Sequence, residues 1–208
     1  MVLSAKNTRL RDILCRRQKT KSEGKVDMVF GMFLLLLVVL VVMYESRLQA
    51  VRMAGDTVED ALAGALLAAA VIDVEKYGRT GEVCVADAVG AYGMFTDALR
   101  HNLQLTTSDY STNDDLLYGK VELTDFRIYH VVGEDVTEQS VVVGSSLPPY
   151  VIGKKGEAKT PDGVTIENTT LYGKVSFHIK GLFYEELSGE KEKSVDIVRS
   201  KEIENEKE

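Results

Sequence analysis

The sequence predicts an α+β protein with an N-terminal transmembrane helix that continues into an amphipathic stalk, a second antiparallel helix, and a small antiparallel β-sheet. Three observations predict this architecture. Residues 28–44 carry no charge, residues 45–103 favour helix, and hydrophobic residues alternate with a period of two after residue 119. A chain of 208 residues suffices for one modest domain in addition to a membrane segment.

Residues 1–25 form a basic leader that we expect to lie in the cytoplasm. The leader contains eight Lys or Arg and only two acids, whereas the whole chain has a net charge of -7. The leader is therefore about +6 and the remainder about -13. Because an acidic domain repels phosphate groups, we expect no nucleic-acid partner.

Residues 26–44 form the predicted transmembrane helix. The 17 residues Met28–Tyr44 are uncharged and dominated by Leu, Val, Met and Phe. They correspond to about 25 Å of helix, at the short end of what crosses a bilayer. Basic residues are concentrated before this segment, so the positive-inside rule places the N-terminus in the cytoplasm and the rest outside the cell membrane. A cleaved signal peptide and a buried core helix are the alternatives, although no A-x-A cleavage site follows.

After residue 44 the sequence predicts a stalk with a helix-packing seam. Apolar or small residues recur at alternating spacings of three and four, which is a heptad pattern. They are Leu48, Val51, Gly55, Val58, Leu62, Ala65, Ala69 and Ile72. This seam packs either on the protein's own domain or on a neighbouring subunit, and Gly55 is a candidate bend. We expect Gly78 to end this helix and Thr80 to cap a second one over Glu82–Leu103.

The outer domain, residues 45–184, continues with predicted strands. Val121–Val132 forms a long strand whose inward-facing positions slip by one residue before Phe126, which suggests a bulge. Further strands are expected at Gln139–Val143 and Gly173–Ile179, with short ones at Tyr150–Ile152 and Val164–Ile166. The tail, residues 185–208, is rich in charge, and we predict that it is disordered or a frayed helix.

No pattern in the sequence indicates catalysis, a cofactor or a metal site. His101, His130 and His178 occur singly, and Cys15 and Cys84 are expected on opposite sides of the membrane. The acids of the loop Thr106–Asp115 lack the spacing of a calcium loop. We therefore expect no enzyme activity and no small-molecule substrate.

A basic leader ending in Ser22-Glu23-Gly24, a membrane helix that continues as a stalk, and a small β-containing outer domain together resemble type IV pilin-like proteins. The nearest type is the minor pilin or pseudopilin of tight-adherence (Tad/Flp) pili. The resemblance implies that a prepilin peptidase cuts after Gly24 and that an acid near the new N-terminus pairs with a neighbouring amino group. The family has a glutamate at the fifth mature position, where this chain has Val29. Asp27, at the third position, is the nearest acid.

The expected function is that of a non-enzymatic structural subunit of a bacterial pilus or secretion assembly. Its expected partners are the lipid bilayer and other membrane-anchored pilin-like or assembly subunits. The alternative is a stand-alone membrane-anchored binding or sensory domain outside the cytoplasm, with the loop Ser145–Thr160 as its contact surface.

Overall fold

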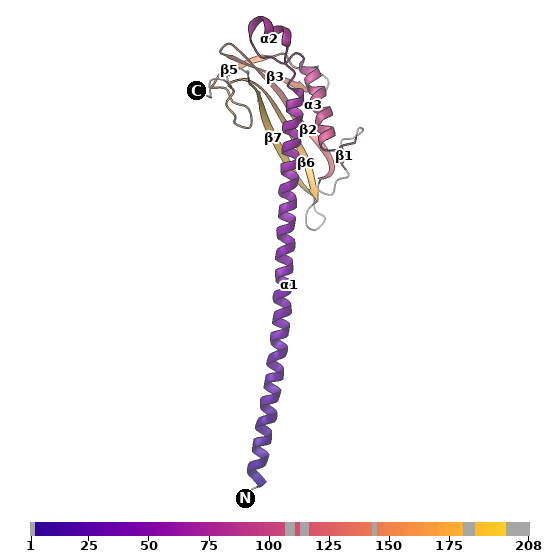
Figure 1. The fold of residues 1–208 in the computed structure, drawn as a ribbon, viewed down its shortest axis with the longest axis vertical. Helices are drawn as coiled ribbons and strands as arrows, with labels where there is room; N and C mark the ends of the chain where they lie inside the picture. Colours follow the sequence, from indigo (N-terminus) through magenta and orange to yellow (C-terminus); the bar gives the residue numbers. More distant parts are fainter. Residues whose placement is uncertain (1–2, 107–110, 113–116, 143–144, 181–185, 199–208) are drawn as a thin grey trace. The chain divides into compact units, whose positions relative to one another are not determined.

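The computed structural model describes residues 3–106, 111–112, 117–142, 145–180 and 186–198. The side chains are described from residue 27 onwards, except at residues 180 and 186. The fold is α+β, with a long N-terminal helix and an antiparallel sheet (Figure 1). The chain divides into two compact units, Met1–Gln49 and Ala50–Glu208. The first is helical, and the second contains the sheet.

Three helices are described: α1 (Leu3–Ala69), α2 (Val74–Thr80) and α3 (Ala88–Asn102). The strands are β1 (Ser111–Thr112), β2 (Leu117–Val132), β3 (Asp135–Val142), β4 (Ser145–Ser146), β5 (Tyr150–Lys154), β6 (Thr169–Lys180) and β7 (Glu186–Ile197). The predicted strands at Val121–Val132, Tyr150–Ile152 and Gly173–Ile179 are confirmed, each within a longer element.

The first helix ends earlier than the sequence predicts. α1 is continuous through Gly55 but stops at Ala69, nine residues before Gly78. Asp73 then caps α2 by accepting a hydrogen bond from the Lys76 N–H at 2.9 Å. The helix α2 ends at Thr80, and the residue that caps it, Gly81, has a φ of 71°, in the left-handed region that glycine adopts most easily. The expectation that Gly78 ends a helix is therefore wrong, because Gly78 lies inside α2.

The helix α3 begins later than predicted. Residues 81–87 are not helical, and Val85 forms a β-bridge with Ile72. Asp87 then caps α3, and its carboxylate accepts hydrogen bonds from the backbone N–H groups of Val89 and Gly90 at 3.0 Å. The buried face of α3 comprises Ala88, Ala91, Phe95 and Leu99. The predicted helix start at Glu82 is wrong, and so is the predicted cap at Thr80, which is the last residue of α2.

The sheet has the strand order β4-β3-β2-β6-β7, and every pairing in it is antiparallel. The strand β1 pairs with β2, and β5 pairs with β3. A register shift between β2 and β6 occurs at Leu123–Asp125, immediately before Phe126. The predicted slip in this strand is therefore confirmed.

The core lies on both faces of the sheet. One face carries Phe126, Ile128, Leu171 and Val175, which form one hydrophobic cluster with buried residues of α1 and α3. A Cβ at Gly173 would lie 3.3 Å from atoms of Leu62, Leu66 and Phe95, so glycine lets the helices approach the strand closely. The opposite face carries a smaller cluster of Tyr129, Val136, Ile166 and Tyr172.

The prediction that residues 185–208 are disordered or a frayed helix is wrong for Glu186–Ile197, which form strand β7. This strand pairs with β6 along its whole length, from Glu186 opposite Lys180 to Ile197 opposite Thr169. Its charges alternate between the two faces and find partners, as in the ion pair of 2.7 Å between Glu190 and Lys174. Residues 199–208 lie outside the described part of the chain.

Candidate functional site: the two apolar segments of α1

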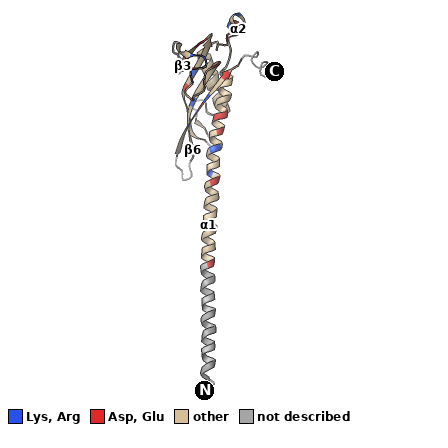
Figure 2. Cartoon of the chain, turned by 90° about the vertical axis from the view of Figure 1, so that its left-hand side faces the viewer, with Lys and Arg blue, Asp and Glu red and all other residues tan. Residues whose placement is uncertain are grey.

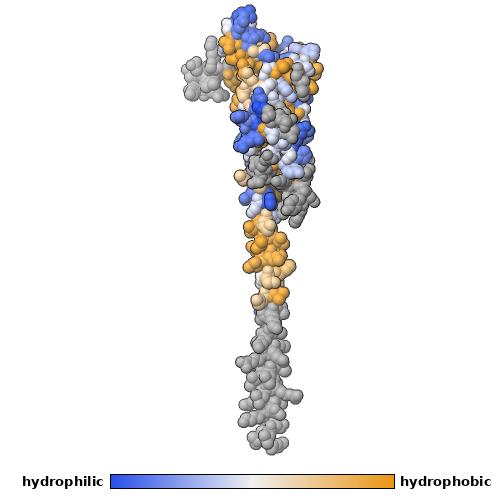
Figure 3. All heavy atoms as spheres, turned by 90° about the vertical axis from the view of Figure 1, so that its right-hand side faces the viewer, coloured by the Kyte–Doolittle hydropathy of each residue, from blue (hydrophilic) through white to orange (hydrophobic). Residues whose placement is uncertain are grey.

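The first apolar segment is Met28–Tyr44, in the helical unit. Its large side chains expose between 48% and 76% of their surface. Figure 3 shows this part of α1 as a hydrophobic stretch, and Figure 2 shows it free of charged residues. Within the described residues, one helix is long and apolar enough to cross a membrane, and this segment lies in it. A signal sequence near the N-terminus has the same properties.

The second apolar segment, Ala54–Ala69, belongs to the unit that contains the sheet. The predicted seam divides here into two parts. Leu48, Val51 and Gly55 are partly exposed. Val58, Leu62, Ala65 and Ala69 are fully buried in the hydrophobic cluster that includes the sheet and α3. For these four residues, packing on the protein's own domain is the arrangement that the structure has.

The heptad pattern missed part of this buried stripe. Ala54, Ala61 and Leu66 are also buried, because a helix that packs on a sheet presents a wider stripe than a coiled-coil seam does. The side chains of Asp56, Thr57 and Asp60 are exposed on the remaining surface of this segment.

A cluster of three charges joins this segment of α1 to strand β7. The Glu59 carboxylate accepts hydrogen bonds of 2.8 Å from the ammonium groups of Lys191 and Lys193. Both lysines lie on the helix-covered face of the sheet, opposite Val175 and Gly173. Their hydrogen bonds and positive charges, with Lys191 the larger contributor, lower the pKa of Glu59 to about 2. This cluster was not predicted from the sequence, because Glu59 is more than 130 residues away from either lysine.

The opposite face of the sheet carries a second polar network. Glu138 is 6% exposed and accepts hydrogen bonds from Arg127 at 3.2 Å and from the Tyr150 hydroxyl at 2.9 Å. Arg127 also pairs with Asp125 at 2.6 Å, and this hydrogen bond raises the pKa of the guanidinium. Each of these charged groups thus has a hydrogen-bond or ion-pair partner in the network, which is the condition for burying charge in a fold.

The histidines and cysteines form no recognisable reactive site among the described residues. Burial lowers the pKa of His130, whose Nδ1 atom is buried without a hydrogen-bond partner. Cys84 is buried, and its Sγ atom accepts a hydrogen bond of 3.0 Å from Lys76. No group of three or more His, Cys, Asp or Glu in the described residues is arranged to hold a metal ion. Asp109, Asp114 and Asp115 lie outside those residues.

The two residues implied in leader processing, Gly24 and Asp27, both lie within α1, and the side chain of Asp27 is exposed. Comparison with known proteins identifies no family for this chain. The chain matches no family model, and neither a curated protein nor a solved structure is significantly similar to it.

Proposed function

We propose that this protein is a membrane-anchored, non-enzymatic structural subunit of the pilin-like kind, working in a bacterial pilus or secretion assembly. One observation carries the proposal. The helix that contains the exposed apolar segment Met28–Tyr44 also supplies fully buried residues, from Ala54 to Ala69, to the core of the sheet domain.

The exposed segment supports a membrane anchor on physical grounds. Soluble proteins rarely expose a contiguous apolar surface of this size, and a bilayer removes it from water. The basic leader before the segment favours an N-terminus in the cytoplasm and a sheet domain on the other side. The anchor is then a single pass.

The sharing of α1 supports a structural role. A domain tethered for binding alone needs no more than a flexible linker to its anchor. Here the helix of the anchor also provides seven buried residues of the domain's core, so the core cannot form without this helix. This arrangement suits a subunit in which helix contacts at the membrane are coupled to the folded domain.

The partly exposed residues of the seam are the proposed contacts with other subunits. Leu48 follows the membrane segment and is partly exposed. Val51 packs partly against the core of the sheet domain and leaves the rest of its surface exposed. Helix association near a bilayer depends on close van der Waals contact, which such residues supply. We propose that they continue the membrane helix as a stalk surface for neighbouring subunits.

The test is cysteine cross-linking of the full-length protein in native membranes, after extraction with alkaline carbonate. Cys15→Ser removes the leader thiol, and a single cysteine is then introduced at Leu48. The matched control carries the cysteine at Gln49, the next residue, whose side chain is exposed. Retention in the membrane pellet and a cross-linked dimer specific to the Leu48 variant are expected.

Two outcomes would contradict the proposal in different ways. Recovery of the protein in the soluble fraction would exclude a membrane anchor. Membrane retention with no more cross-linking at Leu48 than at Gln49 would instead favour the stand-alone binding domain. The exposed side chains of Leu147, Tyr150 and Val151, in the predicted contact loop, would then be the surface to test.

A further inference from the structure

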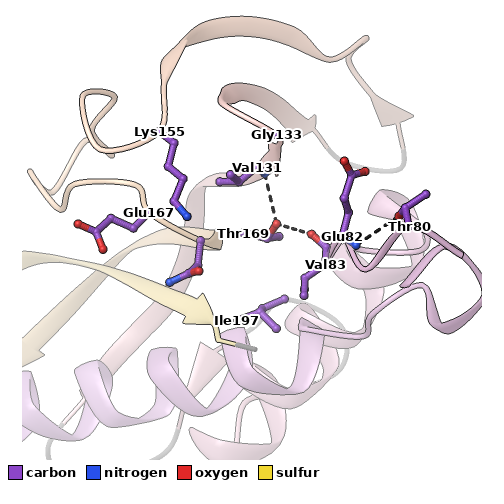
Figure 4. Close-up of a pocket in the computed structure, with 10 residues that line it drawn as sticks. Thr80, Glu82, Val83, Val131, Gly133, Lys155, Glu167, Thr169 and Ile197 are labelled. Atoms are coloured by element: carbon purple, nitrogen blue, oxygen red, sulfur yellow. Dashed lines mark hydrogen bonds between the residues drawn. The ribbon is translucent and has the colours of Figure 1, made fainter. Parts of the chain in front are cut away.

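The sheet domain contains a polar cavity of about 320 Å³ (Figure 4). It lies among the end of α2, the turn between β2 and β3, the loop before β6, and the end of β7. Thr169 lies between these elements, because its hydroxyl donates to the Val83 carbonyl and accepts from the Val131 N–H at 3.3 Å. The Thr169 hydroxyl is thus occupied by the protein itself, and its bonds hold the cavity walls together.

One wall of the cavity carries a positive charge. Lys154 and Lys155 are adjacent, but Lys154 pairs with Asp135 whereas Lys155 makes no ion pair with any described residue. The backbone N–H of Lys155 donates to the Glu134 carbonyl at 2.9 Å, which fixes the loop that carries it. The amide of Asn168 lines the cavity too and offers hydrogen-bond donors.

A negative charge lies on the other side. In Figure 4, Glu82 and Lys155 lie on opposite sides of Thr169. The contact of Glu82 with Lys76 measures 3.9 Å, which is long for an ion pair, so its carboxylate retains capacity to bind a second cation. Glu167 adds a further acid to the lining.

Three aliphatic side chains also line the cavity, together with Thr80 and Gly133. They are Val83, in the segment between α2 and α3, Val131 in β2 and Ile197 in β7, and Val83 is 7% exposed. A cation, an anion across from it and an aliphatic wall match the three parts of one class of ligand. The cavity volume is at the lower end of the range for small-molecule sites.

We propose that this cavity binds a small aliphatic α-amino acid in its zwitterionic form. The ligand carboxylate pairs with Lys155 and Asn168, the ligand ammonium pairs with Glu82, and the side chain contacts Val83, Val131 and Ile197. The binding of an amino acid is separate from membrane anchoring and from subunit contacts.

Binding is tested by isothermal titration of the full-length protein in detergent micelles. The probes are L-leucine, N-acetyl-L-leucine, which lacks the ammonium group, and L-leucinamide, which lacks the carboxylate. L-leucine should bind at least tenfold more tightly than either analogue, since each analogue loses one charged hydrogen bond. Equal affinity for all three probes, or no binding of L-leucine to folded protein, would overturn the proposal.

Two variants test which residue binds each charged group of the ligand. Lys155→Met should weaken L-leucine binding about tenfold and leave L-leucinamide binding unchanged. Glu82→Gln should also weaken L-leucine binding about tenfold, and it should leave N-acetyl-L-leucine binding unchanged. Lys159→Met is the matched control, because it removes a charge from the same loop at a residue that does not line the cavity. Circular dichroism of each variant verifies that it is folded. A Lys155→Met variant that is folded and binds L-leucine as tightly as the Lys159→Met control would contradict the assignment.

Discussion

Two apolar segments of the same helix differ in what surrounds them. Met28–Tyr44 is apolar on every side and exposed along its whole length, whereas Ala54–Ala69 buries one stripe and exposes polar residues such as Asp56 and Asp60. A segment that is apolar all round requires an apolar environment from outside the chain, while a one-sided segment finds its partners within the chain. The distribution of polar residues, more than the apolar content, therefore separates the proposed anchor from the core.

The largest effect is expected from a charge in the second segment. Leu62 is fully buried beside Gly173, so Leu62→Asp places an unpaired carboxylate in the core of the sheet domain. A loss of about 4–5 kcal/mol is expected, which is enough to unfold a marginal domain. Protease resistance of the sheet domain in isolated membranes measures the effect. Thr57→Asp, on the exposed surface of the same segment, is the control and should retain resistance. Equal resistance of both variants would show that α1 is not part of the core.

The same charge in the first segment should have a different effect. Leu36 is 55% exposed and lies in the middle of the uncharged run. Leu36→Asp should leave the fold of the sheet domain intact and reduce membrane insertion by about 2.5–3.5 kcal/mol. The fraction that resists carbonate extraction measures this change. If Leu36→Asp abolishes the protease resistance of the sheet domain but not membrane retention, the two segments do not have the separate roles proposed here.

A smaller effect is expected where the second segment meets the sheet. A Cβ at Gly173 lies 3.3 Å from three core side chains, so Gly173→Val overpacks the contact between α1 and β6 by about 1–3 kcal/mol. Gly93 in α3 has no atom within 4 Å of an added Cβ, and Gly93→Ala should stabilise its helix slightly. Urea denaturation followed by circular dichroism gives both values. A Gly173→Val variant as stable as the wild type would mean that α1 does not pack closely on β6.

The features that depend on local sequence were predictable. The uncharged run, the alternation in β2 and β6, and the slip before Phe126 are visible without knowledge of any partner. The errors concern elements whose conformation depends on distant residues. Val85 lies outside a helix and forms a β-bridge with Ile72, and the charged residues of β7 form a strand because they pair with β6 and Glu59. In sequence alone, the charge density of β7 is typical of disorder.

The cavity illustrates the same limit. Glu82, Lys155 and Ile197 come from three parts of the chain that are far apart in the sequence, and no spacing in the sequence links them. The proposed ligand could not be predicted from the sequence, because a sequence motif consists of residues that are neighbours in the chain. The cavity is formed by the pairing of β2, β6 and β7, which only the fold supplies.

The smallest effect concerns the charges that hold α1 to β7, and it depends on pH. The pKa of Glu59 is about 2 in the folded state against 4.5 for the free side chain, so its ion pairs stabilise the fold above pH 4.5. This contribution is lost as the pH falls towards 2, because the folded carboxylate then becomes protonated. The side chain of Glu59 is 35% exposed, so solvent screening limits the contribution to about 1 kcal/mol.

The measurement is the free energy of unfolding of wild type and Glu59→Gln across a pH series, with other carboxylates cancelling in the difference. Glu59→Gln should be less stable by about 1 kcal/mol at pH 6, and the difference should decrease below pH 4.5. Glu157→Gln, an exposed acid for which no ion pair with a described residue occurs, is the control and should show no such trend. A constant difference between wild type and Glu59→Gln down to pH 3 would mean that the two lysines do not lower the pKa of Glu59. The second segment of α1 would then be held to β7 by apolar contacts alone.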